Sequence, residues 1–202
     1  MHLIPTRGEV VELLRQTGGL RKGHFEYPNG FHTDEYLQVA LTMRRFEAAK
    51  ILSVGLSRLI RAHADLRALI PELSIVAPAT GGLPVAYGMC EALRARQVYW
   101  AERGDDGDLH LRQFMEIQPG EKILLVDDIL RTGSKLVELK KLVEGRGGEV
   151  VGVAVLIYQP EPGAASFGTL PFYFLAQLDG AYIDAKSCEL CERGVPLQKT
   201  FA

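Results

Sequence analysis

The sequence predicts an α/β fold in which helices flank a mostly parallel, twisted sheet. Short apolar runs alternate with helix-length amphipathic stretches from residue 73 to residue 178, a pattern typical of strand–helix–strand units. Runs such as "ILLV" at 123–126 and "VVGVAVLI" at 150–157 lack a polar residue at every second position, as expected of strands that are buried on both faces. The 202 residues are enough for one domain with a large core.

The expected elements follow from local patterns. Thr6 and Glu9 form a capping-box pattern before a helical apolar repeat that ends at Gly18. A second periodic segment, residues 46–66, can cover one face of the sheet. The later segments are expected to be strands at 73–79, 97–102, 121–128, 149–158 and 171–178, with helices at 82–95 and 133–147.

Composition excludes several classes of function. With 23 Lys and Arg against 25 Asp and Glu, the net charge is -2, so there is no basic field for nucleic acid. No stretch approaches the roughly 18 apolar residues of a membrane span, and the N-terminus lacks the pattern of a signal peptide. We therefore expect a cytoplasmic protein with one domain over residues 1–202, whose tail beyond about Asp179 wraps over the domain or a partner.

Two adjacent carboxylates, Asp127 and Asp128, end the apolar run "KILLV", and the loop "RTGSK" follows them and opens a helix. Ligands of open parallel sheets bind at the carboxyl ends of strands. The amide groups of this loop, with the Thr132 and Ser134 hydroxyls, can form an anion cradle, while the carboxylates can bind sugar hydroxyls directly or through a divalent metal. The alternative is an ordinary strand-to-helix turn with capping residues.

The segment "ILLVDDILRTGSK" resembles the motif of type I phosphoribosyltransferases that binds phosphoribosyl pyrophosphate (PRPP). Further segments are similar to blocks of orotate phosphoribosyltransferases in the same order. These segments lie at 23–41, 76–93, 98–103, 111–128, 147–157 and 188–197. The resemblance implies a type I phosphoribosyltransferase-like fold with a small hood, formed by residues up to about 40 together with the C-terminal tail, which also provide dimer contacts.

The resemblance also implies roles for single residues. Asp127 and Asp128 would hold the ribose of PRPP, and Arg103, assisted by Arg112, would stabilise the departing pyrophosphate. The other residues implied in substrate binding lie in three loops and the hood, and they are Ala79, Thr80, Gly81, Gly82, Arg131, Thr132, Gly133, Ser134, Lys135, Phe25, Asn29 and Gly30. Mg²⁺ would be bound through PRPP oxygens and water and not by a protein cage.

The sequence departs from the family pattern mainly where the base would bind. Arg131 stands where the family usually has Thr, and Tyr158-Gln159 replaces an Asp-Arg pair whose arginine meets orotate. Orotate phosphoribosyltransferases commonly have a lysine-rich loop here, but the segment between Arg103 and Arg112 contains no lysine. Arg112 could take over the charge role of the missing lysine, with His110 as a weaker candidate. Asn29-Gly30 replaces a common Ser-Gly.

Cys188 and Cys191 form a Cys-x-x-Cys pair, which could supply half of a four-thiolate zinc site. Because the sequence has no second such pair, a fold-ending turn with two reduced cysteines is the simpler interpretation, and a metal shared across a dimer is the alternative. His24 and His32 could either pack within the hood or contact the base.

The favoured function is transfer of the phosphoribosyl group of PRPP to orotate in pyrimidine nucleotide biosynthesis by a homodimeric enzyme. Three alternatives stay open at this point: a salvage phosphoribosyltransferase for another base, a non-catalytic PRPP-binding regulator, and a subunit that activates a catalytic homologue.

Overall fold

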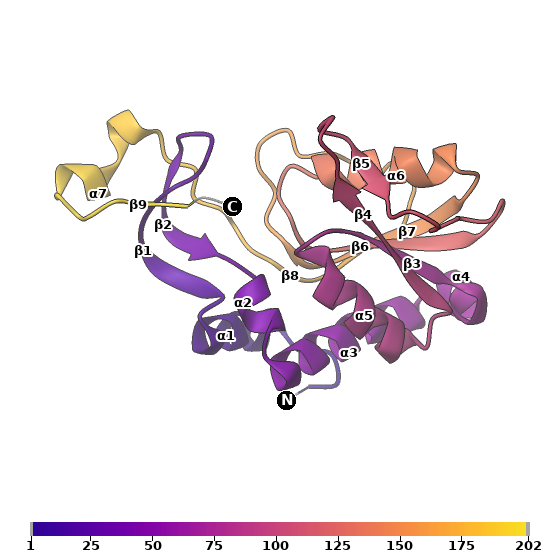
Figure 1. Cartoon of the computed structure of the whole chain (residues 1–202). Coiled ribbons are helices and arrows are strands. Elements are labelled where there is room, and N and C mark those ends of the chain that lie inside the picture. The colour runs from indigo at the N-terminus through magenta and orange to yellow at the C-terminus, as the bar shows by residue number, and fades with distance from the viewer. Residues whose placement is uncertain (1, 201–202) are drawn as a thin grey trace.

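The central sheet has six strands in the order β5-β4-β3-β6-β7-β8, and every neighbouring pair is parallel except β4 and β5. This arrangement is seen in a computed structural model that describes residues 2–200 (Figure 1), and it confirms the predicted mostly parallel α/β fold. The strands are β3 (Ser74–Pro78), β4 (Gln97–Arg103), β5 (Leu109–Leu111), β6 (Lys122–Leu130), β7 (Glu149–Tyr158) and β8 (Phe172–Gln177).

Helices cover both faces of this sheet (Figure 1). The main helices are α1 (Arg7–Thr17), α3 (Phe46–Ala62), α5 (Gly82–Leu93) and α6 (Ser134–Gly145). The side chains of β6 alternate between two apolar cores: Leu124 and Val126 join the core that includes α3 and α5, while Ile123 and Leu125 join the core that includes α6. Burial on both faces explains why "ILLV" has no polar alternation.

A second, smaller sheet forms the hood at one side of the central sheet (Figure 1). In this sheet β1 (Leu20–Glu26) pairs antiparallel with β2 (His32–Leu37), and β9 (Gln198–Lys199) of the tail lies parallel to β1. The tail therefore returns to the hood of its own chain, which is one of the two courses expected from the sequence. The small elements between these parts are α2 (Ala40–Met43), α4 (Ala64–Leu69), η1 (Ile70–Glu72), η2 (Ala185–Ser187) and α7 (Glu189–Glu192).

The helix boundaries follow the predicted signals with one exception. The Thr6–Glu9 capping box is present, and α1 ends at Gly18, whose φ of 78° suits glycine. The continuous segment expected over 46–66 is divided, because His63 is extended, with φ -86° and ψ 116°, between α3 and α4. Within residues 2–200, no helix has both the length and the apolar character needed to cross a membrane.

Candidate active site

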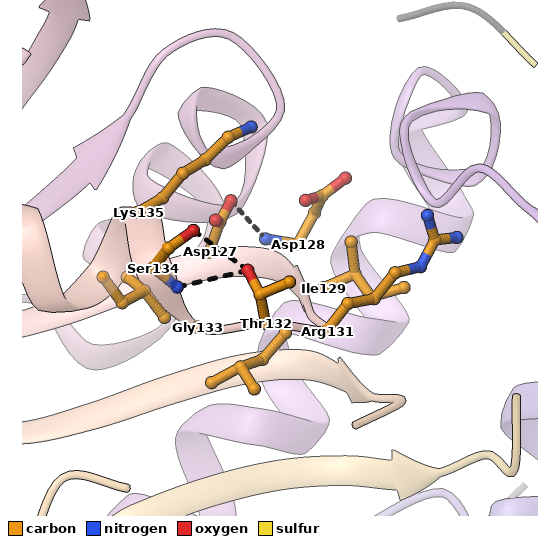
Figure 2. Close-up of a pocket in the computed structure, with 10 residues that line it drawn as sticks. Asp127, Asp128, Ile129, Arg131, Thr132, Gly133, Ser134 and Lys135 are labelled. Atoms are coloured by element: carbon orange, nitrogen blue, oxygen red, sulfur yellow. Dashed lines mark hydrogen bonds between the residues drawn. The ribbon is translucent and has the colours of Figure 1, made fainter. Parts of the chain in front are cut away.

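The carboxyl end of β6 and the loop that leads into α6 enclose a cavity of about 190 Å³, lined by residues 127–136 (Figure 2). The peptide chain reverses here from a strand in the middle of the sheet to the first turn of a helix. The cavity is therefore at the strand end where open parallel sheets bind ligands. It brings together the residues predicted from "DDILRTGSK", among them Asp127, Asp128, Arg131 and Lys135.

Asp127 and Asp128 differ in their surroundings. Asp127 is only 6 % exposed, and its Oδ1 accepts a hydrogen bond from the amide of Asp128 at 2.9 Å. Burial, and next the charge of Asp128, raise the pKa of Asp127 well above its ordinary value. Burial also raises the pKa of Asp128. In the free protein the pair therefore favours a protonated state. A bound cation or a ligand with hydroxyl groups would favour the ionised state.

The predicted pyrophosphate loop, Ala79 to Gly82, lies directly against these carboxylates. A Cβ atom at Gly81 would be 3.1 Å from Oδ2 of Asp128, and one at Gly82 would be 3.2 Å from Oδ1 of Asp127. Contacts of this length are tighter than a Cβ atom normally makes, so glycine favours the close approach at both positions. The peptide bond between Ala79 and Thr80 is cis. The contacts of Gly81 and Gly82 with Asp127 and Asp128 therefore join two segments that are distant in sequence into one site.

The loop from Thr132 to Ser134 is shaped as an anion cradle. Thr132 Oγ1 lies 2.9 Å from Ser134 Oγ and accepts a hydrogen bond from the Ser134 amide at 3.3 Å (Figure 2). Gly133 is the N-cap of α6 and has a φ of 75°, a conformation that is costly for residues with a Cβ atom. The first amides of α6 and the positive end of its dipole face this loop, an arrangement suited to a phosphate group.

Arg131 joins the sheet to the hood. Its Nε donates to Oε1 of Gln159 at 3.1 Å and its NH2 group donates to the Leu37 carbonyl at 3.0 Å. The guanidinium carbon also lies 5.1 Å from the centre of the Tyr27 ring, within range of a cation–π interaction. Arg131 is therefore a half-buried bridge between β6 and the hood, not the freely solvated surface arginine that was the alternative.

Two residues that depart from the family pattern, Arg131 and Gln159, contact each other in this bridge. Gln159 is 4 % exposed and is the hydrogen-bond partner of Arg131. Tyr158 instead packs among Phe172 and Phe174, with ring centres 5.2 Å away in each case. From the sequence, Gln159 was identified only as the replacement for a family arginine. The contacts of Arg131 with Tyr27 and Leu37 were not predicted, because they depend on the position of the hood.

The hood residues predicted to bind substrate do not line the cavity. Phe25 is 4 % exposed and packs against Tyr36, with ring centres 5.5 Å apart. Asn29 and Gly30 form an exposed turn between β1 and β2. Their role in binding the base stays a prediction.

Arg103 and Arg112 also lie outside the cavity. Arg103 forms an ion pair of 2.8 Å with Glu138 on α6, and Arg112 pairs with Glu102 at 3.0 Å. His110 lies 2.8 Å from Asp106. Both arginines are on the exposed β4–β5 edge of the sheet, so neither completes the site of its own chain in this conformation.

The chain matches the family model described as "Phosphoribosyl transferase domain" over residues 49–168, which is more than half of its length. It is 34% identical over 191 residues to the orotate phosphoribosyltransferase of Carboxydothermus hydrogenoformans, covering 95% of each chain. It is 32% identical over 192 residues to that of Thermus thermophilus, covering 95% of this chain and 99% of the relative. The chain belongs to the phosphoribosyltransferase family.

Solved structures show the same fold. The crystal structure of orotate phosphoribosyltransferase from Aeropyrum pernix superimposes with a TM-score of 0.68 at 18% identity, covering 84% of this chain and 93% of that one. Adenine phosphoribosyltransferase from Leishmania tarentolae superimposes with a TM-score of 0.59 at 16% identity, covering 83% and 87%. Since transferases named for different bases share it, the phosphoribosyltransferase fold alone does not select the base.

We expect Asp128→Asn to lower turnover of this phosphoribosyltransferase by about a hundredfold, the effect typical of losing one electrostatic contact to a transition state. The free enzyme should be at least as stable as wild type at neutral pH, because the substitution removes repulsion from buried Asp127. Steady-state kinetics and thermal unfolding measure the two effects. The exposed carboxylate variant Asp65→Asn, on α4 at the other end of the sheet, is the control and should change neither.

The same pair makes stability pH-dependent. Because the folded-state pKa of Asp127 is raised, the folded protein retains a proton that the unfolded chain releases, and stability falls as pH rises from about 4 through the folded pKa. Asp128→Asn should weaken this decline in the ligand-free protein. An unchanged pH profile, or normal turnover, would contradict the assignment.

Proposed function

We propose that the protein transfers the phosphoribosyl group of PRPP to orotate and releases pyrophosphate, as a step in pyrimidine nucleotide biosynthesis. The observation that carries the proposal is the arrangement at the end of β6, where a carboxylate pair and a phosphate cradle line one cavity and a glycine loop lies against the carboxylates. PRPP has a ribose, a pyrophosphate and a 5-phosphate, one group for each of these three features.

The roles of the residues follow from this match. Thr132, Gly133, Ser134 and Lys135 bind the 5-phosphate, and Ala79 to Gly82 lie against the pyrophosphate. The bond from ribose C1 to pyrophosphate breaks as a bond from C1 to a ring nitrogen of the base forms. Asp127 and Asp128 stabilise the electron-poor ribose that develops between these events. No covalent intermediate with the protein is required, because positioning of the reactants and stabilisation of charge provide the rate enhancement.

Orotate is favoured over a neutral base for two reasons. The similar relatives from two organisms are named orotate phosphoribosyltransferases, and Arg131 brings a fixed positive charge to the boundary of sheet and hood. A guanidinium can bind a carboxylate through two parallel hydrogen bonds. Arg131 thus substitutes for the arginine that Gln159 replaces, and Gln159 orients it.

Mg²⁺ is the cofactor that suits the site. Burial raises the pKa of both adjacent carboxylates, so a nearby cation would favour their ionised form, in which they can accept hydrogen bonds from the water shell of the ion. The ion itself would bind through pyrophosphate and ribose oxygens and water, in keeping with its preference for such ligands. When bound, it would supply positive charge that stabilises the leaving pyrophosphate.

We also propose a homodimer, in which Arg103 or Arg112 serves the neighbouring subunit's site. Support comes from the position of both arginines, which are exposed at the β4–β5 edge and paired with Glu138 and Glu102 outside the cavity. The cytoplasmic location expected from composition stays a prediction.

The function is tested by incubating the full chain with PRPP and Mg²⁺ against orotate, uracil, adenine and hypoxanthine while following pyrophosphate release. Release that depends on orotate is expected. Release with a neutral base alone would identify a salvage enzyme, and PRPP binding without turnover on any base would identify a regulator or an activating subunit.

Base recognition is tested with Arg131→Thr. We expect orotate binding to weaken about tenfold to a hundredfold, the value of one charge-assisted hydrogen bond of about 1.5 to 3 kcal/mol, with PRPP affinity nearly unchanged. Calorimetric titration of each ligand measures this. Arg131→Lys is the control, because it keeps the charge but lacks the two-pronged geometry, and it should be intermediate. Equal orotate affinity in wild type and Arg131→Thr would remove Arg131 from base recognition.

The dimer is tested by mixing two inactive variants, Asp128→Asn and Arg103→Ala, after unfolding and refolding them together. If the arginine acts across the interface, half of the sites in each hybrid dimer are intact, so random pairing should restore about a quarter of wild-type activity. If it acts within its own chain, no site is intact and activity stays low. Arg112→Ala provides the parallel test, and sedimentation gives the oligomeric state.

A further inference from the structure

Four potential metal ligands from distant parts of the chain converge where the tail meets the hood. His24 lies on β1, His32 begins β2, and Cys188 and Cys191 lie at the start of and within α7. One ligand atom from each residue lies within 4.8 Å of all the others. The sequence marked the two cysteines as half of a site, and the structure supplies the second half from within the same chain as two histidines.

Four of the six separations between the ligand atoms are close to the edges of a tetrahedron around one zinc ion. His24 Nε2 lies 3.0 Å from His32 Nδ1, 3.4 Å from Cys188 Sγ and 3.6 Å from Cys191 Sγ. Cys191 Sγ lies 3.3 Å from His32 Nδ1. Tetrahedral zinc, with bonds of about 2.0–2.1 Å to nitrogen and about 2.3 Å to sulfur, has edges of about 3.3–3.8 Å. The remaining two separations, from Cys188 to His32 and to Cys191, are at most 4.8 Å, so the four atoms surround a space in which one ion can be bound.

The neighbouring hydrogen bond of His24 orients the ring for this role. His24 Nδ1 lies 2.8 Å from the Val195 carbonyl, which accepts a hydrogen bond and so assigns the proton to Nδ1. Nε2 is then left with its lone pair directed at the cluster. Metal-binding histidines usually donate their other ring nitrogen to a carbonyl or carboxylate in this way.

The cluster is more crowded than hydrogen bonding requires. Nε2 of His24 has a single lone pair, yet His32 Nδ1 and two thiols all lie against it. A single donor can use that lone pair, so most of these close contacts are not hydrogen bonds to Nε2, although Cys191 can donate to His32 Nδ1 instead. His24 is 1 %, His32 4 % and Cys188 1 % exposed, so three of the four groups are held together away from water. A metal ion uses all four lone pairs at once.

Apart from this cluster, the tail contacts the hood mainly through Thr200, which donates to the Glu26 carbonyl, and through the Tyr182 ring. From Asp179 to Lys199, Cys188 is the one buried residue, and β9 pairs with β1 over two residues. The backbone of His32 does exchange two hydrogen bonds with Ile183, of 2.8 and 2.9 Å, which brings the tail to the ligands. Cys191 is exposed and gives an ion a path of entry.

We propose that His24, His32, Cys188 and Cys191 bind one structural Zn²⁺ that fastens the C-terminal tail to the hood. Two thiolates and two imidazoles in tetrahedral arrangement favour zinc over the harder ions Mg²⁺ and Ca²⁺. Four protein ligands leave no open position for a substrate, so the ion stabilises the fold and takes no part in the transfer reaction. The site is separate from the carboxylate pair and independent of which base is used.

The test is elemental analysis of the full-length protein, purified without a histidine tag or chelator from a zinc-supplemented culture. About one zinc per chain is expected in wild type and in the control Cys90→Ser, whose thiol lies on α5 away from the hood. Cys191→Ser and His24→Ala should lose most of it. Cobalt substitution should give wild type, but not Cys191→Ser, the intense visible bands of tetrahedral cobalt thiolate.

Thermal stability provides a second measurement. A zinc chelator should lower the Tm of wild type and expose the tail to limited proteolysis, with little effect on Cys191→Ser. Fewer than about 0.1 zinc per wild-type chain together with no tetrahedral cobalt spectrum would overturn the proposal. Equal zinc in wild type and Cys191→Ser would also overturn it, because the metal would then be bound elsewhere.

Discussion

The structure depends most on one electrostatic constraint, the burial of two adjacent carboxylates at the end of the central strand β6. Burial raises the pKa of both, and the charge of Asp128 raises that of Asp127 further. Such a pair is tolerated only where other groups compensate it. Lys135 and the amides at the start of α6 lie on one side, and Arg131 lies on the other. The site therefore stores an unfavourable interaction that a cation or a sugar with several hydroxyl groups can relieve.

The same constraint fixes the neighbouring backbone. Because a Cβ atom at Gly81 or Gly82 would lie only 3.1–3.2 Å from a carboxylate oxygen, the start of α5 and the loop before it have little room for side chains there. A ligand held by the carboxylates would lie against bare backbone amides of this loop, as a pyrophosphate group requires. Chemistry that needs mainly positioning and charge can be carried by such a rigid strand-end arrangement.

The hood is joined to this core by Leu20 and Leu37, which belong to the main apolar core, and by Arg131, which links the end of β6 to Leu37 and Tyr27. The tail pairs with β1 through the two residues of β9. Between Asp179 and Lys199 the tail buries only Cys188, so a cluster of two histidines and two cysteines between tail and hood is well placed to supply the missing stability. Metal coordination commonly takes over this role where a core is too small.

Local patterns in the sequence determined much of this protein. The capping box of Thr6, the doubly buried strands and the strand–loop–helix unit of Asp127 to Lys135 each depend on residues near one another in the chain, and all three were predicted. The family resemblance added the pairing of the carboxylates with the glycine loop. Tertiary structure alone decided that Arg131 binds Gln159 and the hood, that Arg103 and Arg112 are held by Glu138 and Glu102, and that His24 and His32 meet Cys188 and Cys191. Those contacts join residues from 10 to 167 positions apart, and their geometry is set by the packing of hood, tail and sheet, which local sequence does not encode.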